Sequence, residues 1–298
     1  MDPARIAQED DKFKPCVRSE GSSLQGDVAI RRLEVVCAAL VVLHLASGAP
    51  LSWAQSPYVL NPTREAVLIG SGVAAGLVAY GVHDKAVGLT EEEVAGLSRS
   101  DVNGFDRGAT YQYSTEADEL SDWMAYAIVL SPATLLLSGP VREDAATFGV
   151  MYGETVLLTV AAVQLTKGLV LRTRPYAYNP DAPPDSKTTV EARQSFYSSH
   201  TALAFASAVF ISVTFQAYEP DSPLRPWIWA ASLSVATTIA VLRYTSGSHF
   251  PTDILAGAAI GTLAGIAVPS LHKVGQGDLS VVPAAGPRGV QVSFRMLL

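Results

Sequence analysis

The residues best suited to chemistry in this sequence are an arginine, a histidine and an aspartate near the C-terminal end. Arg243 lies six residues before His249, and Asp253 lies four residues after it. Pro251 favours the first turn of a helix, so Asp253 can reach back toward His249. A carboxylate bonded to one imidazole nitrogen fixes the tautomer and leaves the other nitrogen free as a nucleophile. This block therefore predicts an activated imidazole beside a cation.

An upstream block supplies two more cations. Lys167 and Arg174 are seven residues apart, which is two helical turns to within about 20°, so both point the same way if one helix carries them. Pro175 disfavours helical geometry at Arg174, so this helix should end there. A lysine and an arginine at a helix exit can bind several phosphate oxygens. The competing interpretation is that two basic side chains extend from a membrane edge into water.

The second histidine lies at the start of an apolar stretch. Ser198 predicts a helix N-cap there, with Ser199 and His200 in the first turn. Helix N-termini bind anions through their free N–H groups, so a phosphate would lie near His200. The three blocks thus place cations, imidazoles and a carboxylate at the ends of long apolar segments, as phosphoryl transfer through a histidine requires.

A metal site is the alternative chemistry for His249 and Asp253. Their spacing could give two ligands, but a metal site would need more carboxylates or a third histidine nearby. The blocks supply cations instead. We therefore expect neither a metal nor a cofactor at this site.

Six apolar stretches of about 17–24 residues must hold these blocks, close to the ~20 residues that cross a bilayer as a helix. They are Ala66–Val82, Trp123–Val141, Phe148–Leu171, Ser199–Tyr218, Pro226–Leu242 and Ile254–Leu271. Charged residues make up 16% of the chain, below the roughly 25% of soluble domains. The expected fold is all-α, a membrane-embedded bundle of about six helices. A water-soluble helical bundle with an unusually apolar core is the alternative.

The N-terminal part of the chain has the pattern of an exported protein. Residues 1–27 are polar and of mixed charge, which predicts disorder. Two arginines then precede the short apolar run Val35–Leu45, and small residues end at Ala54. This pattern predicts a secretory signal peptide cleaved after Ala54, with an uncleaved signal anchor as the alternative. The protein would then belong to a bacterial-type cell envelope.

The chain divides into four parts by composition. We expect a leader with the signal peptide over residues 1–54, a first helix and polar connection over 55–122, a core over 123–273 and a tail over 274–298. Residues 279–297 alternate apolar and polar around a turn, which predicts a β-hairpin. In the polar connection, Asp101–Asp106 is faintly like a calcium loop. Its glycine stands at the wrong position and the closing glutamate is missing, which excludes that site.

The three blocks in this order resemble the three-part signature of the type 2 phosphatidic acid phosphatase superfamily. That superfamily includes lipid phosphate phosphatases, bacterial class A acid phosphatases and vanadium haloperoxidases. The resemblance covers residues 120–271. The second block usually reads Pro-Ser-Gly-His, and here it is Tyr197 followed by two serines and His200. The third usually begins Ser-Arg, and here it begins Leu242-Arg243.

The resemblance implies a role for each residue of the blocks. His249 would attack phosphorus and form a phosphohistidine, Asp253 would orient it, and His200 would protonate the leaving alkoxide and later activate water. The residues that would hold the phosphate oxygens are Lys167, Arg174, Arg243, Ser198 and the backbone of Ser199. The expected enzyme is a metal-independent phosphoric monoester hydrolase, with anhydrides as further substrates, that acts on a lipid phosphate or diphosphate in a membrane.

Three other functions are weighed against this one. A soluble periplasmic acid phosphatase is the nearest, followed by a vanadate-dependent haloperoxidase, although haloperoxidases of this family are soluble and larger. A binding or structural membrane protein with an inactive site is disfavoured because the charged and imidazole residues are all retained. A net charge of −7 disfavours nucleic acid as a partner. The sequence identifies neither the lipid, nor the oligomeric state, nor the side of the membrane that the three blocks share.

Overall fold

The structure is a computed structural model that describes residues 56–83, 86–275, 279–286 and 289–296, the last two ranges by their backbone. The leader and signal peptide that the sequence predicts over residues 1–54 lie outside the described residues.

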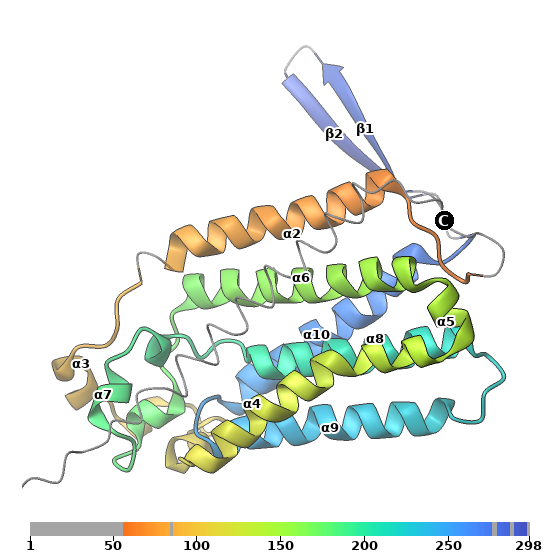
Figure 1. Cartoon of the computed structure of the whole chain (residues 1–298). Helices are drawn as coiled ribbons and strands as arrows, with labels where there is room; N and C mark the ends of the chain where they lie inside the picture. Colours follow the sequence, from red (N-terminus) through yellow and green to blue (C-terminus); the bar gives the residue numbers. More distant parts are fainter. Residues whose placement is uncertain (1–55, 84–85, 276–278, 287–288, 297–298) are drawn as a thin grey trace, which may run out of the picture.

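Six long helices lie side by side in one bundle (Figure 1). They are α2 (Pro62–His83), α4 (Thr115–Leu130), α6 (Ala145–Val170), α8 (Ser199–Tyr218), α9 (Arg225–Thr245) and α10 (Pro251–His272). Within the described residues, six helical stretches are long and apolar enough to cross a membrane. The expected all-α bundle is confirmed, and the length and composition of its helices are those of an integral membrane protein.

The second apolar stretch is less regular than the sequence predicts. α4 begins several residues before Trp123 and ends at Leu130. The chain continues as the 3-10 helix η3 (Ser131–Leu137) and the short helix α5 (Gly139–Glu143). Prolines near the start of both short helices lack an N–H group, so the regular helix cannot continue through them. The early start of α4 brings acidic residues into the bundle.

α8 is the most buried of the long helices, and it lies closest to α10. Three glycines of α10, four residues apart, face the backbone of α8. A Cβ atom on Gly261 would lie 2.0 Å from the carbonyl oxygen of Ala202, and one on Gly257 would lie 2.7 Å from that of Ser198. Only glycine permits such an approach. The close packing brings the first turn of α10 against the first turn of α8.

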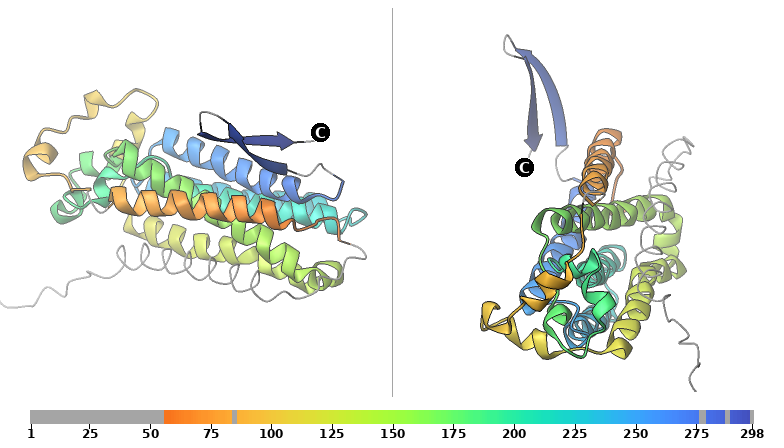
Figure 2. Two further views of the ribbon diagram at one scale, coloured as in Figure 1. Left: turned by 90° about the horizontal axis from the view of Figure 1, so that it is seen from above. Right: turned by 90° about the vertical axis from the view of Figure 1, so that its left-hand side faces the viewer.

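α2 lies along α6 on the outside of the bundle, which Figure 2 shows from two further directions. The two helices approach closely where a glycine of one faces an apolar side chain of the other. A Cβ atom on Gly72 would lie 2.8 Å from Cγ of Leu157, and one on Gly168 would lie 2.8 Å from Cγ1 of Val82. The outer face of α2 exposes large apolar side chains such as Leu77. That pattern suits a helix whose outer face meets lipid rather than protein.

The short helices that connect the long ones gather largely at one end of the bundle, to the left in Figure 1. They are α3 (Glu91–Ala95), η1 (Arg99–Asp101), η2 (Arg107–Tyr111), η4 (Pro175–Tyr178), α7 (Pro184–Lys187) and η5 (Glu191–Arg193). The polar connection and the loop after α6 therefore cover the same end, and this is the end at which the three sequence blocks lie.

The tail forms a two-stranded antiparallel sheet. β1 (Leu279–Gly286) pairs with β2 (Gly289–Met296), and Leu279 lies opposite Met296. This is the hairpin that the alternating pattern of the tail predicts.

Candidate active site

The three sequence blocks meet at the end of the bundle that the short helices cover. α6 contributes Lys167, whose Nζ lies 3.4 Å from Oγ of Ser199 at the start of α8. The N–H group of Ser198 donates to the carbonyl of Asp253 at 3.2 Å, which joins α8 to α10. The structure thus brings together residues that lie far apart in the sequence.

His249 is fully buried at the centre of this site. Its Nδ1 lies 2.8 Å from the carbonyl oxygen of Ser195. Because a carbonyl only accepts hydrogen bonds, Nδ1 carries the proton and Nε2 of the neutral ring keeps its lone pair. Nε2 has no hydrogen-bond partner among the described residues. Burial, and then the charges of Arg174, Arg243 and Lys167, hold the pKa of His249 well below its usual value.

Asp253 does not make the bond to His249 that the sequence predicts. Its Oδ2 lies 3.8 Å from Nδ1 of His249, beyond hydrogen-bond distance. That oxygen instead accepts from Oγ of Ser195 at 2.5 Å and from the N–H group of Phe250 at 2.9 Å. Asp253 lies in the first turn of α10, so its carboxylate reaches back to the N–H group of Phe250, the N-cap residue of that helix. Asp253 is therefore linked to His249 through Ser195, whose hydroxyl bonds to the carboxylate and whose carbonyl bonds to the imidazole.

A partly buried ion-pair network supports Asp253 from the other side. Arg172 pairs with Asp253 and, at 2.8 Å, with Asp106 of the polar connection. Asp106 also accepts from the N–H group of Thr252 at 3.0 Å. Burial raises the pKa of Asp106, but hydrogen bonds from Asn103, Arg172 and Thr252 outweigh burial and lower it. The segment that looked faintly like a calcium loop thus anchors the first turn of α10.

His200 and Arg243 both bind carboxylates of α4. Nε2 of His200 lies 2.8 Å from Oδ1 of Asp122, and its Nδ1 has no hydrogen-bond partner within the described part of the chain. A guanidinium nitrogen of Arg243 lies 2.8 Å from Oδ1 of Asp118 and 3.6 Å from Oδ1 of Asp122. The two acidic residues therefore hold an imidazole and a guanidinium in fixed positions beside each other.

Lys167 and Arg174 do not lie on one helix, contrary to the prediction. α6 ends at Val170, and Leu171 turns the chain with a positive φ of 47°. Arg174 follows in extended conformation, with φ −72° and ψ 151°. The residue before a proline favours extended geometry, and here the helix ends several residues before it. Nε of Arg174 is buried and lacks a hydrogen-bond partner among the described residues.

Ser198 caps α8 as the sequence predicts. Its Oγ accepts from the N–H group of Thr201 at 3.4 Å and from the Thr201 hydroxyl at 3.0 Å. Ser199, in the first turn, contacts Lys167 through its side chain.

Several residues of the site escaped the sequence analysis. They are Asp106, Asp118, Asp122, Arg172 and Ser195. The two acidic residues of α4 lie four positions apart and so share one helix face, a signal that the sequence does contain. Ser195 gave no signal, because it bonds to His249 through its backbone carbonyl, a group that every residue has.

The part of the chain that carries the three blocks matches a known family. Residues 148–275 match the model described as PAP2 superfamily. This segment belongs to the PAP2 superfamily. It begins within α6, so α2, the polar connection and α4 with its two acidic residues lie outside the matched PAP2 segment.

A curated relative and a solved structure are similar to this chain. The relative is a lipid A 1-phosphatase of Porphyromonas gingivalis, 34% identical over 74 residues. That match covers 25% of this chain and only 15% of the relative's length. The structure is that of a transmembrane PAP2 type phosphatidylglycerolphosphate phosphatase from Bacillus subtilis. It is 17% identical, with a TM-score of 0.37, and the match covers 82% of this chain and 94% of that one.

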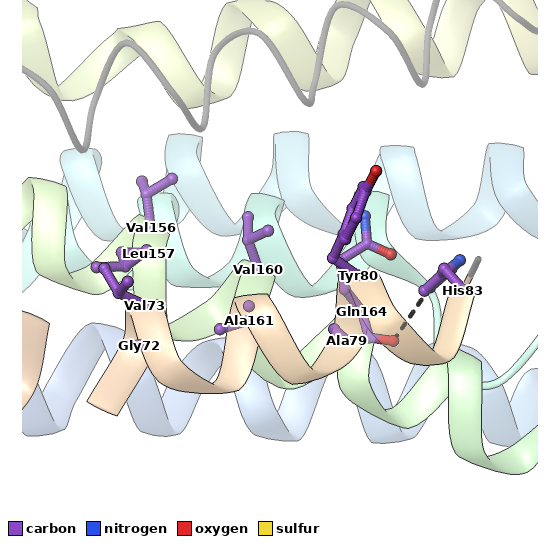
Figure 3. Close-up of a pocket in the computed structure, with 11 residues that line it drawn as sticks. Gly72, Val73, Ala79, Tyr80, His83, Val156, Leu157, Val160, Ala161 and Gln164 are labelled. Carbon is purple, nitrogen blue, oxygen red and sulfur yellow. Dashed lines mark hydrogen bonds between the residues drawn. The ribbon is translucent and has the colours of Figure 1, made fainter. Parts of the chain in front are cut away.

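An apolar cavity of about 160 Å³ lies between α2 and α6 (Figure 3). Small and apolar side chains line most of it, and His83 and Gln164 lie at one end. Nε2 of His83 lies 3.3 Å from the carbonyl oxygen of Gln164. A Cβ atom on Gly168 would lie 3.6 Å from the His83 ring. That end of the cavity therefore adjoins the turn of α6 that carries Lys167.

Proposed function

We propose that this protein is a phosphatase that hydrolyses a lipid phosphate or diphosphate through a phosphohistidine on His249. The observation that carries the proposal is the environment of that imidazole. Its Nδ1 is bonded to the Ser195 carbonyl, and its Nε2 has no hydrogen-bond partner in the described part of the chain and is subject to the charges of three cations. A neutral, buried imidazole with a directed lone pair suits attack on an electrophile that carries negative charge.

In the first chemical step, Nε2 of His249 forms a bond to phosphorus while the bond from phosphorus to the leaving oxygen breaks. Phosphoryl transfer spreads negative charge over the three equatorial oxygens, so catalysis depends on positioning and on neutralising that charge. Lys167, Arg174 and Arg243 supply this neutralisation, assisted by Ser198 and the backbone of Ser199 at the start of α8. The reaction needs no redox change and no co-reactant other than water.

His200 supplies the proton in the first step and takes one in the second. The protonated imidazole donates to the leaving alkoxide, and the neutral ring then removes a proton from the water that attacks the phosphohistidine. Inorganic phosphate leaves and His249 is restored. Such acid–base assistance contributes about 10²–10⁴-fold to the rate. Asp122 fixes the direction of the His200 ring, because its carboxylate bonds to Nε2 and leaves Nδ1 to face the substrate.

Two observations favour a lipid substrate over a soluble one. The helices that hold the site are long and apolar enough to lie in a bilayer. The cavity between α2 and α6 ends beside the turn that carries Lys167, so one acyl chain could run along it while the phosphate lies at His249. The name of the curated relative, a lipid A 1-phosphatase, points to the same class of substrate.

The test is phosphate release from vesicles or micelles of several lipid phosphates, with a soluble phosphomonoester for comparison. We expect release from at least one lipid, inhibition by vanadate, full activity in EDTA during the assay, and acid-labile ³²P-label on the wild-type protein. His249→Ala should lose both the release and the label. Equal rates on the soluble ester would favour a soluble-substrate phosphatase, and halide oxidation with added vanadate would favour a haloperoxidase. Dependence of phosphate release on added Mg²⁺ would contradict the mechanism.

A further inference from the structure

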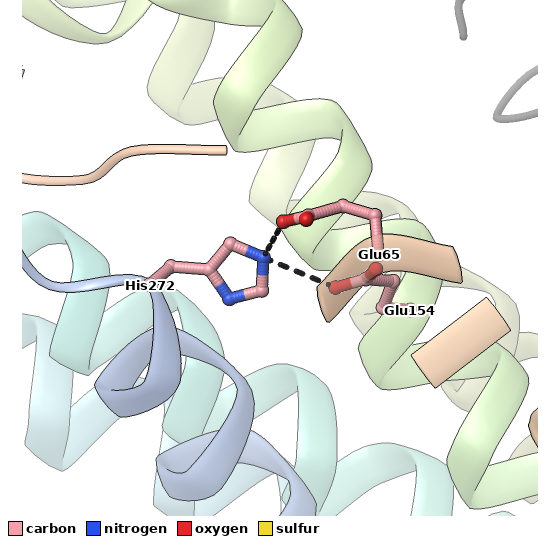
Figure 4. A group of neighbouring side chains, drawn as sticks. All are labelled: Glu65, Glu154 and His272. Carbon is pink, nitrogen blue, oxygen red and sulfur yellow. Dashed lines mark ion pairs between the residues drawn. The ribbon is translucent and has the colours of Figure 1, made fainter. Parts of the chain in front are cut away.

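Three buried side chains meet near the opposite end of the bundle from His249 (Figure 4). Glu65 comes from the first turn of α2, Glu154 from α6 and His272 from the last turn of α10. Nε2 of His272 lies 2.9 Å from Oε1 of Glu65 and 3.2 Å from Oε2 of Glu154. α10 is 22 residues long, or about 33 Å, so its length separates this cluster from His249.

In its neutral form, His272 directs a lone pair into the cluster. Its Nδ1 lies 2.8 Å from the carbonyl of Val268, so Nδ1 carries a proton and Nε2 of the neutral ring does not. This arrangement is the usual support of a metal-binding histidine, whose other ring nitrogen bonds to a backbone carbonyl or a carboxylate. Three electron-rich atoms then converge within 4.8 Å of one another. A cation between them, either a proton or a metal ion, must relieve their repulsion.

The two carboxylates differ in what already satisfies them. Glu65 accepts from the guanidinium of Arg64 at 2.9 Å and from the N–H group of Asn61 at 2.9 Å, so it is held in place. Glu154 is fully buried, and its Oε1 has no hydrogen-bond partner among the described residues. Burying a carboxylate oxygen without a hydrogen-bond partner costs free energy. A single proton on His272 would still leave Oε1 of Glu154 without a partner. A metal ion would satisfy this carboxylate together with the imidazole.

We propose that Glu65, Glu154 and His272 bind one divalent transition-metal ion, for which Zn²⁺ is the probe. One imidazole and two carboxylates are ligands that zinc accepts, at about 2.0–2.2 Å each, which places tetrahedral neighbours about 3.3 Å apart. The distances from Nε2 to the two oxygens are close to that value. Arg64 would remain bonded to the ligating Glu65. The ion would join α2, α6 and α10, so its role is structural and separate from the proposed phosphatase chemistry.

The test uses the full-length protein purified in detergent after growth with added zinc. We expect about one zinc per chain in the wild type, and loss of this zinc in His272→Ala and in Glu154→Gln. Glu143→Gln, which changes an exposed glutamate just before α6, is the matched control and should retain the zinc. Zinc retained by the double variant His272→Ala, Glu154→Gln would overturn the proposal.

A second measurement uses only the wild-type protein, so it does not depend on whether a variant folds. Wild-type protein depleted with a strong chelator should melt at a lower temperature, and Zn²⁺ should restore the melting temperature. Co²⁺ should give the visible absorption of a tetrahedral site. Protein that carries no zinc, is not stabilised by it and gives no cobalt absorption would overturn the proposal and leave a proton on His272 as the cation of an ion-pair cluster.

Discussion

The two ends of α10 each hold a fully buried histidine, and the two rings are held alike. Nδ1 of His249 and Nδ1 of His272 both lie 2.8 Å from a backbone carbonyl, so each ring presents Nε2 to its surroundings. The surroundings differ in charge. His249 lies in the field of Lys167, Arg174 and Arg243, whereas His272 faces two carboxylates. One tautomer can therefore serve a nucleophile at one end and a cation ligand at the other, because the neighbouring charges decide what Nε2 attracts.

The largest effect is expected when the imidazole of His249 is removed from the end of α10 that faces the three cations. His249→Ala should lower the rate of phosphate release by more than about 10³-fold, because it removes the imidazole that forms the proposed covalent intermediate. Turnover of a preferred lipid phosphate measures this, with circular dichroism to verify folding and Glu143→Gln as the control. A variant that retains wild-type turnover would show that the two ends do not differ in chemistry as we infer.

A smaller effect comes from removing one cation while keeping the imidazole. Arg174→Gln should lower kcat/KM by about 10²-fold or more, because one guanidinium no longer stabilises the transition state. The pH dependence should change as well. Positive neighbours penalise the protonated ring and lower the pKa of His249, so removing one should raise that pKa. The acid limb of the kcat/KM profile should then move to higher pH.

The control for that profile is Arg225→Gln at the far end of α9, which should leave the acid limb where it is. If the limb does not move in Arg174→Gln, its charge does not act on His249.

The next effect concerns the carboxylate that binds the second histidine. Asp122→Asn keeps the shape of the side chain but removes the charge bonded to His200, so kcat should fall by about 10–10²-fold with little change in KM. A substrate with a good leaving group, such as an aryl phosphate, needs less protonation and should be affected less. Equal losses on both substrates would indicate that Asp122 acts only by holding Arg243.

The smallest effect concerns the apolar cavity between α2 and α6. Gly76 lines it, and a Cβ atom there would meet no neighbour within 4 Å, so Gly76→Leu should fill the cavity without disturbing the backbone. We expect KM to rise several-fold for a long-chain lipid phosphate and to stay constant for a soluble phosphomonoester. Gly70→Leu is the matched control, because Gly70 is equally open but does not line the cavity. A parallel change in both variants would mean that the cavity does not hold an acyl chain.

The sequence by itself determined the six apolar helices, the cap at Ser198 and the candidate residues of the three blocks. Each of these depends on local pattern, because hydrophobic length, capping residues and motif spacing act over one helix or one turn. Residues 148–275 also carried enough of that pattern to match the PAP2 superfamily.

Only the tertiary structure decided how these residues are held. The Ser195 carbonyl, rather than Asp253, bonds to His249, and Asp122 of a distant helix bonds to His200. These contacts depend on how closely α8 and α10 pack, which the α10 glycines permit. The meeting of Glu65, Glu154 and His272 likewise needs three helices in one register. Such contacts join residues separated by most of a domain, and no local propensity records them, because their geometry follows from helix packing rather than from neighbouring residues.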